Sequence, residues 1–179
     1  LLSRWEGWRH FAEDPALEKP QSLSAKQIDK LGEDDRVAYD YYRERYHANF
    51  LVTTPQVKRL NVRLWDSLDA NQQGPSRVKG AAIVDSPPGL GKTTAVDAFG
   101  RAFHRRQILR HGKDFDDGQT LHIPVCHVAF KGNTNTRALN EAILNCYNHP
   151  SAEAAETRHL RNRNLAALAA ESVRRHGTR

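Results

Sequence analysis

The sequence of 179 residues contains no methionine and only two cysteines, Cys126 and Cys146. Because position 1 is Leu1 instead of an initiator methionine, we expect the sequence to be part of a longer protein. The two cysteines have neither the spacing of a metal site nor the number that a disulfide framework needs. They are therefore predicted to be buried, reduced thiols in a cytoplasmic protein.

Long hydrophobic runs are also missing. No apolar run approaches the ~18 residues of a membrane-spanning helix, and no signal peptide is recognisable. Hydrophobic residues make up 39% of the chain and charged residues 27%, with a mean hydropathy of −0.72. These values predict a globular chain with one core and no membrane partner. The net charge of +6 favours a phosphate-rich partner without identifying one.

Metal-ligand spacing is a further absence, although nine histidines are present. His122 with His127, and Cys146 with His149, both lack a third ligand at a useful distance along the sequence. We therefore expect structural histidines and no zinc site.

What the sequence does contain is a phosphate-binding loop. Its residues are Ser86, Pro87, Pro88, Gly89, Leu90, Gly91, Lys92, Thr93 and Thr94. The loop follows an apolar run at 81–84 and precedes a helical pattern, which is the context that this motif requires. We predict that Lys92, the expected catalytic residue, contacts the β- and γ-phosphates and that the Thr93 hydroxyl binds the metal. The expected cofactors are ATP and Mg²⁺.

One position departs from the full G-x-x-x-x-G-K-[ST] pattern, because Ser86 stands where the first glycine is expected. Serine can take that place only if its φ stays negative or the strain is absorbed locally. Since Gly-x-Gly-Lys-Thr-Thr between strand and helix patterns rarely arises by accident, nucleotide binding remains the basis of the functional prediction.

Helical spacing and capping signals predict a series of helices around the loop. Their expected ranges are 24–31, 34–47, 55–68, 92–111, 136–148 and 157–176. On the second of these helices an apolar stripe of Val37, Tyr41 and Tyr42 is expected to be core, with a ligand platform as the alternative. The helix after the loop carries a basic face, which we expect to be solvated, with a nucleic-acid contact as the alternative. The basic residues on that face are Arg101, Arg105, Arg106 and Arg110.

Two segments, 81–84 and 121–130, are predicted strands, and the second is expected to be buried and parallel. Alternation of strands and helices then implies an α/β fold of the P-loop NTPase type, a parallel sheet with flanking helices and right-handed crossovers. The expected domains are a helical N-terminal extension at 1–49 and the front half of an ATPase domain at 50–179. No strand ending in Asp follows the loop, so we expect the Walker B strand beyond residue 179 and no hydrolysis by this segment alone.

The loop 86–93 resembles that of AAA+ ATPases, apart from Ser86 and Leu90. Together with segments 50–55, 124–128 and 133–139, it is similar to the TniB/TnsC group of transposition-associated AAA+ ATPases, over roughly 39–179. The resemblance implies an ATP-driven homo-oligomer on double-stranded DNA that helps a transposase choose its target, in a bacterial cytoplasm. It also implies that residues 50–53 lie near the adenine.

The sequence therefore favours an ATP-binding, DNA-associated regulator of transposition or of another mobile-element process. The alternative is a signalling or defence NTPase in which the nucleotide switches contacts with protein partners. A small-molecule kinase is less favoured because we find no lid or acceptor site. The sequence does not assign the sensor and arginine-finger residues, the preference for ATP over GTP, or the oligomer size.

Overall fold

The computed structural model describes residues 2–15, 17–48, 52–73, 79–115, 118–130, 132, 135–152 and 162–178. The chain divides into two compact units. One unit is Pro15–Ala95, and the other combines Leu1–Asp14 with Val96–Arg179. The predicted domain boundary between 49 and 50 falls outside the described residues and stays a prediction.

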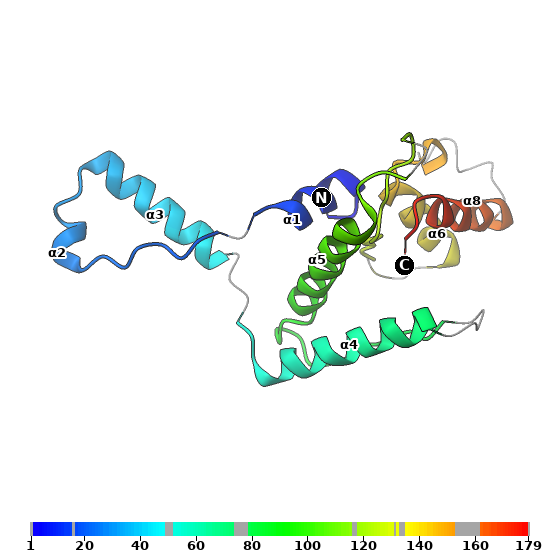
Figure 1. The fold of residues 1–179 in the computed structure, drawn as a ribbon, viewed down its shortest axis with the longest axis horizontal. Coiled ribbons are helices and arrows are strands. Elements are labelled where there is room, and N and C mark those ends of the chain that lie inside the picture. The colour runs from blue at the N-terminus through cyan, green and yellow to red at the C-terminus, as the bar shows by residue number, and fades with distance from the viewer. Residues whose placement is uncertain are drawn as a thin grey trace. The chain divides into compact units, whose positions relative to one another are not determined.

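The described residues form helices and no sheet, so the predicted parallel α/β fold is wrong (Figure 1). The segment 81–84 has no assigned secondary structure, and Ile83 is 91% exposed. One isolated antiparallel bridge, between Asp114 and Leu121, is the nearest approach to β-structure in the described ranges. Strands need neighbours for their backbone groups, and one short apolar run cannot supply them.

The segment 121–130 shows where such backbone groups are satisfied instead. Its buried character is confirmed at His122, Ile123 and Pro124. However, the His122 N–H donates to Lys113 O at 2.9 Å, and the Ile123 N–H donates to His176 O at 2.9 Å. Pro124 has no N–H to donate to a strand ladder. Burial was therefore predictable from apolar character, but these backbone N–H groups bond to residues just after two helices and not to a neighbouring strand.

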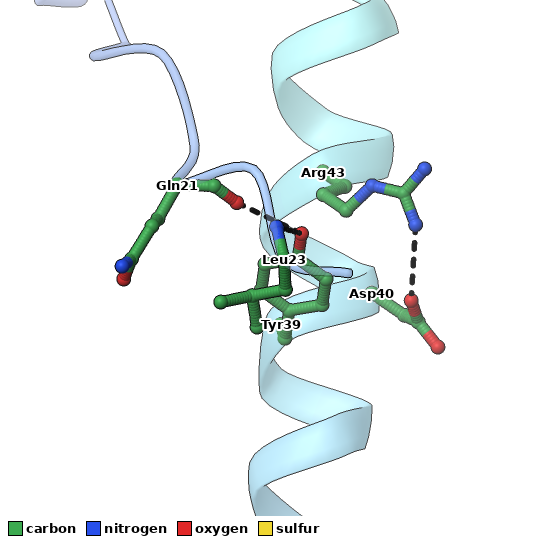
Figure 2. A network of polar contacts seen from close by, with 5 residues as sticks. All are labelled: Gln21, Leu23, Tyr39, Asp40 and Arg43. Carbon is green, nitrogen blue, oxygen red and sulfur yellow. Dashed lines mark hydrogen bonds and ion pairs between the residues drawn. The ribbon is translucent and has the colours of Figure 1, made fainter. Parts of the chain in front are cut away.

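In the unit Pro15–Ala95, the segment before α2 (Ala25–Ile28) is hydrogen-bonded to α3 (Glu33–Ala48). Figure 2 shows the Tyr39 hydroxyl donating to Gln21 O at 2.8 Å and accepting from the Leu23 N–H at 3.4 Å. The Tyr42 hydroxyl donates similarly to Glu18 O at 3.0 Å. These bonds attach the segment before α2 to α3, none of whose residues is buried.

The apolar stripe of α3 is exposed, contrary to the core role predicted for it. Val37 is 65% exposed, Tyr41 67% and Tyr42 36%, and none of the residues of α3 is buried. Helical spacing identified one face of the helix correctly, but spacing carries no information about whether another element covers that face.

The longest helix of this unit is α4 (Pro55–Gln73), and it begins where the sequence predicted. The Thr54 hydroxyl accepts from the Val57 N–H at 3.2 Å, and Pro55 occupies the first helical position. Near the other end, the Asn71 side chain accepts from the Gly80 N–H at 2.8 Å and donates to Gly80 O at 2.9 Å. This pair of bonds, the Asn71 clasp, fastens the segment leading to the phosphate loop to α4.

In the other unit, α1 (Trp5–Glu13) packs its tryptophans into a core with Ile123 and Tyr147. The C-terminal carbonyls of α1 are satisfied by α5 (Lys92–His111), because Arg105 Nε donates to Ala12 O at 2.7 Å. Arg101 and Arg105 also both donate to Asp14 O. Two residues of the predicted basic face therefore cap a helix, as cations near carbonyl ends do.

The rest of this unit is helical as well. A core of Leu144, Leu165 and Ala169 joins α6 (Thr136–Cys146) to α8 (Asn162–Arg175), with a short 3₁₀ helix at Pro150–Ala152. Asn135 caps α6 by accepting from the Ala138 N–H at 2.9 Å. The predicted start of the last helix at 157 lies outside the described residues. Across the described parts of the chain, no helix is long and apolar enough to cross a membrane.

Candidate functional site

The phosphate loop has the backbone conformation that its glycines predict. Gly89 has φ of 81° and Gly91 has φ of 76°, in the left-handed region that L side chains rarely adopt. A Cβ added at either position would meet no atom within 4 Å, so the backbone conformation alone requires glycine here. Such turns direct successive N–H groups toward one side, which favours an anion there.

Ser86 fits the place of the missing first glycine without backbone strain. Among the described residues, Asn148 is the non-glycine residue with positive φ, so Ser86 lies outside that region. Its C=O accepts a hydrogen bond from the ammonium of Lys92. The substitution therefore leaves the loop geometry possible, which answers the condition set by the sequence.

Lys92 is the first residue of α5, and its side chain folds back over the loop. Its Nζ donates to Ser86 O, and it donates to Pro87 O at 3.0 Å. An ammonium has three N–H groups, so a third donor remains for a ligand. The positive charge therefore lies close to the first-turn N–H groups of α5, where the helix dipole also favours an anion.

Next to the loop lies a cavity of about 480 Å³ within the unit Pro15–Ala95. Its lining residues come from the start of α4 and the residue before it, from the loop that precedes α5, and from the first turn of α5. They are Thr54, Gln56, Val57, Leu60, Val84, Asp85, Ser86, Leu90, Gly91, Lys92 and Ala95. Two long helices therefore bring their N-terminal ends to one cavity, and both dipoles favour negative charge in it.

The lining is divided in chemical character. Val57, Leu60, Val84, Leu90 and Ala95 supply apolar surface, and Gln56 supplies an amide that can both donate and accept. Lys92 and Asp85 supply the charges. An apolar pocket with a few convergent polar groups is the usual form of a small-molecule site. This arrangement suits an anionic ligand with an apolar or planar body.

The structure brings some of the predicted loop residues to the cavity and not others. Ser86, Leu90, Gly91 and Lys92 line the cavity. The remaining predicted residues are exposed on the same loop and on the first turn of α5 without lining the cavity. These residues are Pro87, Pro88, Gly89, Thr93 and Thr94. Thr93 is the second residue of α5, next to Lys92, so its predicted metal role remains sterically possible and stays a prediction.

Sequence reasoning missed the contribution of α4. It expected residues 50–53 beside the base, but Phe50 and Leu51 lie outside the described residues, and Val52 is 65% exposed. The structure instead places Thr54 and the following turn of α4 in the lining. The Thr54-Pro55 cap was a visible signal for a helix start, but nothing in the sequence showed that this start meets the phosphate loop.

Within the ranges that the structure describes, no group of three or more His, Cys, Asp or Glu side chains is placed to hold a metal ion. The carboxylate in the cavity lining is that of Asp85, Ser86 supplies a hydroxyl to the same lining, and Thr93 is an exposed hydroxyl residue next to Lys92. Hard cations take oxygen ligands and often bind through a nucleotide's phosphates. These residues therefore fit Mg²⁺ that arrives with a nucleotide.

No protein-family model, curated protein or solved structure matches this sequence.

Proposed function

We propose that the chain binds ATP, with the phosphates at the N-terminus of α5 and the base and ribose in the cavity beside α4. The observation that carries the proposal is the meeting of Lys92, a left-handed glycine loop and two helix N-termini at one cavity with apolar walls. Lys92, the glycine loop and the helix N-termini each favour phosphate. The apolar walls favour the base and ribose of a nucleotide.

In this proposal each residue has a limited role. Lys92 directs an N–H at the β- and γ-phosphates, and the loop N–H groups bind the phosphate oxygens. Thr93 would hold Mg²⁺, and the bound ion would neutralise part of the phosphate charge. None of the described residues lining the cavity is an arginine, and Asp85 is the one carboxylate among them. We therefore expect binding with very slow hydrolysis, since arginine fingers contribute ~10³ to 10⁵ in rate.

As biological setting we propose a DNA-associated regulator of transposition or of another mobile-element process, assembled as a homo-oligomer when ATP is bound. The loop's resemblance to that of transposition-associated AAA+ ATPases supports this setting, as does the net charge of +6. A transposase-type protein would be the further partner.

The alternative is a nucleotide-controlled switch that acts on protein partners. The exposed stripe of α3 favours it, because Val37 and Tyr41 are each about two-thirds exposed. Aromatic side chains in such positions are enriched in protein interfaces.

Isothermal titration calorimetry with ATP and Mg²⁺ tests the nucleotide site. Lys92→Ala should weaken binding at least about thirtyfold, because a charged hydrogen-bond donor contributes about 2 to 3 kcal/mol. Lys58→Ala is the matched control, since Lys58 is an exposed residue of α4 that does not line the cavity. Equal affinities of the Lys92→Ala variant and the native protein would refute this site.

A further inference from the structure

The large side chains of α3 lie on two different sides of the helix. Tyr39 and Tyr42 are three positions apart and share one side, where their hydroxyls bond the segment before α2. Figure 2 shows Tyr39 turned toward this segment. Val37 and Tyr41 are four positions apart and lie about 150° around the helix from that side. Both are exposed, so no described part of the chain covers this second side.

The charges of α3 are divided along the length of the helix. Its first turn carries Glu33, Asp34 and Asp35, and its last turn carries Arg45 and His47. All five residues are exposed. This order makes the helix complementary to a reversed copy of itself, because the acidic turn of one copy then lies beside the basic turn of the other. A parallel pair would instead place like charges together, and flanking charges of this kind set the orientation of paired helices.

We propose that the exposed side of α3 binds the same side of a second copy of the chain, with the two helices antiparallel about a twofold axis. Each contact of such a pair occurs twice. A pair centred between Val37 and Tyr41 brings Val37 of each copy against Tyr41 of the other. Asp34 and Arg45 lie nearly equally far from that centre and on the same edge of the exposed side. Asp34 of each copy therefore lies opposite Arg45 of the other.

The length of α3 limits the strength of this pair. Its 16 residues span about 24 Å, and a contact between two such helices belongs to the small end of specific interfaces. We therefore expect a weak, reversible dimer that forms as the protein concentration rises. The pairing requires no nucleotide, so it is separate from the ATP-driven assembly proposed above and from the cavity beside α4.

Sedimentation equilibrium without nucleotide, over a concentration series up to about 1 mM, measures the association. The native protein should approach the mass of a dimer as its concentration rises. Lys92→Ala should associate equally well, because Lys92 lies at the phosphate loop and not on α3. This comparison separates the pairing of α3 from the proposed nucleotide site. A native protein that stays monomeric throughout the series would overturn the proposal and leave the exposed side to a different protein.

A matched pair of valines tests whether the dimer uses this side of α3. Val37→Ser should raise the dissociation constant at least about fivefold, because both copies lose an apolar contact. Val62→Ser is the control, since Val62 is a comparably exposed valine of α4 in the same unit. It should leave the association unchanged. Equal dissociation constants for Val37→Ser and the native protein would mean that the dimer forms through another surface.

Charge exchange tests the antiparallel orientation. Asp34→Arg and Arg45→Asp should each weaken the dimer at least about fivefold, because like charges then meet twice in one pair. The double variant Asp34→Arg/Arg45→Asp restores opposite charges and should regain the native association. In a parallel pair it would not, since like residues would still face one another.

Asp35→Arg is the matched control for these charge variants. It makes the same charge change in the same turn of α3, so it has the same effect on the helix dipole. However, Asp35 lies on the side of Tyr39 and Tyr42, so its substitution should leave the dimer intact. Circular dichroism compares the helix content of the variants. An equal loss of association in Asp35→Arg, or a double variant as weak as the single ones, would overturn the antiparallel pairing.

Discussion

The Lys92 ammonium has acceptors before any ligand arrives. Its bonds to the carbonyls of Ser86 and Pro87 hold the charge over the loop, so binding does not require the side chain to be ordered from solution. Ordering a free lysine side chain costs up to about 2 kcal/mol of rotamer entropy. Because the Lys92 side chain is already ordered, less of its interaction free energy with a phosphate would be offset by lost entropy. This favours phosphate binding by the loop.

The neighbouring threonines offer a matched pair for testing the metal. Thr93 and Thr94 are both exposed on the first turn of α5. Thr93→Ala should weaken ATP binding in Mg²⁺ several-fold more than in EDTA, because only the hydroxyl contact with the metal is lost. Thr94→Ala should change both affinities equally. Calorimetry under the two conditions measures the difference, and equal losses for Thr93→Ala would assign its hydroxyl to packing or capping.

A second residue with a measurable effect is His104, which has no exposed surface and has both ring nitrogens buried without a hydrogen-bond partner. Burial lowers its pKa from 6.5 to about 4, partly opposed by Glu13 and reinforced by His122, Arg105 and Lys113. Because the unfolded chain takes up this proton at higher pH than the folded chain, stability is complete above about pH 6.5. It is lost as the pH falls toward about 4.

The expected loss is about 3 kcal/mol in the free energy of unfolding between pH 7 and pH 4. His104→Gln should remove most of this pH dependence, whereas His10→Gln, at an exposed position in the same unit, should retain it. Urea unfolding followed by tryptophan fluorescence in a Trp65→Phe background reports on the buried Trp5 and Trp8. A pH dependence as steep in His104→Gln as in the native protein would exclude His104 as its source.

Among the secondary-structure elements, α4 positions the phosphate loop through the Asn71 clasp. Residues 81–84 are largely exposed, so apolar packing contributes little to holding them, and the two side-chain bonds to Gly80 carry more of the attachment. Lys79 adds a bond from its ammonium to Asn71 O at 2.6 Å. Residues 79 and 80, at the start of the segment that leads to the phosphate loop, are therefore attached to α4.

Asn71→Ala should weaken ATP binding at least about fivefold, because two neutral hydrogen bonds contribute about 1 to 3 kcal/mol to holding the segment. Asn71→Asp keeps the acceptor for the Gly80 N–H and should lose less. Gln72→Ala, at the next and exposed position of α4, is the control. Calorimetry gives the affinities, and circular dichroism checks that α4 stays helical. Native affinity in Asn71→Ala would mean that the clasp does not position the loop.

The helices and the strands differed in how far the sequence could predict them. The starts of α4 and α5 and the end of α5 were predicted within a residue, because Thr54-Pro55, the glycine loop and Gly112 act on adjacent backbone groups. The strands were wrong, since pairing depends on another segment. An apolar run shows that a segment is hydrophobic but not which segment it pairs with. In the predicted strand 81–84, Ile83 is exposed, and in 121–130 the His122 N–H donates to Lys113 O.

On the scale of the whole molecule, the candidate site was predictable where it is local. The glycine turn within residues 86–92 was identified from its residues alone, and Gly89 and Gly91 have the left-handed backbone expected of it. Phosphate binding by this loop stays a prediction. The α4 side of the cavity depends on contacts between segments that are distant in sequence, which have no local signal. The same limit explains the basic face of α5, where Arg101 and Arg105 cap α1.

That capping changes which arginines are expected to contact DNA, if the ATP-loaded protein binds duplex as proposed. Arg110 is exposed in the last turn of α5. Arg110→Ala should therefore reduce the slope of log K against log salt by about 0.9, uniformly across DNA sequences. Arg105→Ala should instead lower the stability of the unit containing α1, by about 1 to 3 kcal/mol for the carbonyls left unsatisfied.

Fluorescence anisotropy with a labelled duplex, measured with ATP and Mg²⁺ at several salt concentrations, gives the slopes, and urea unfolding gives the stabilities. Arg137→Ala serves as the control for both, because its guanidinium pairs with Glu141 at 2.8 Å within one helix, α6, and an (i, i+4) helix pair contributes only about 0.3 to 0.5 kcal/mol. The native protein should bind duplex with a negative salt slope and no sequence preference, since phosphate contacts carry no base information. A protein saturated with ATP that shows no salt-dependent binding to DNA would direct the functional proposal to the protein-partner switch, with the exposed Val37 and Tyr41 of α3 as the surface to test next.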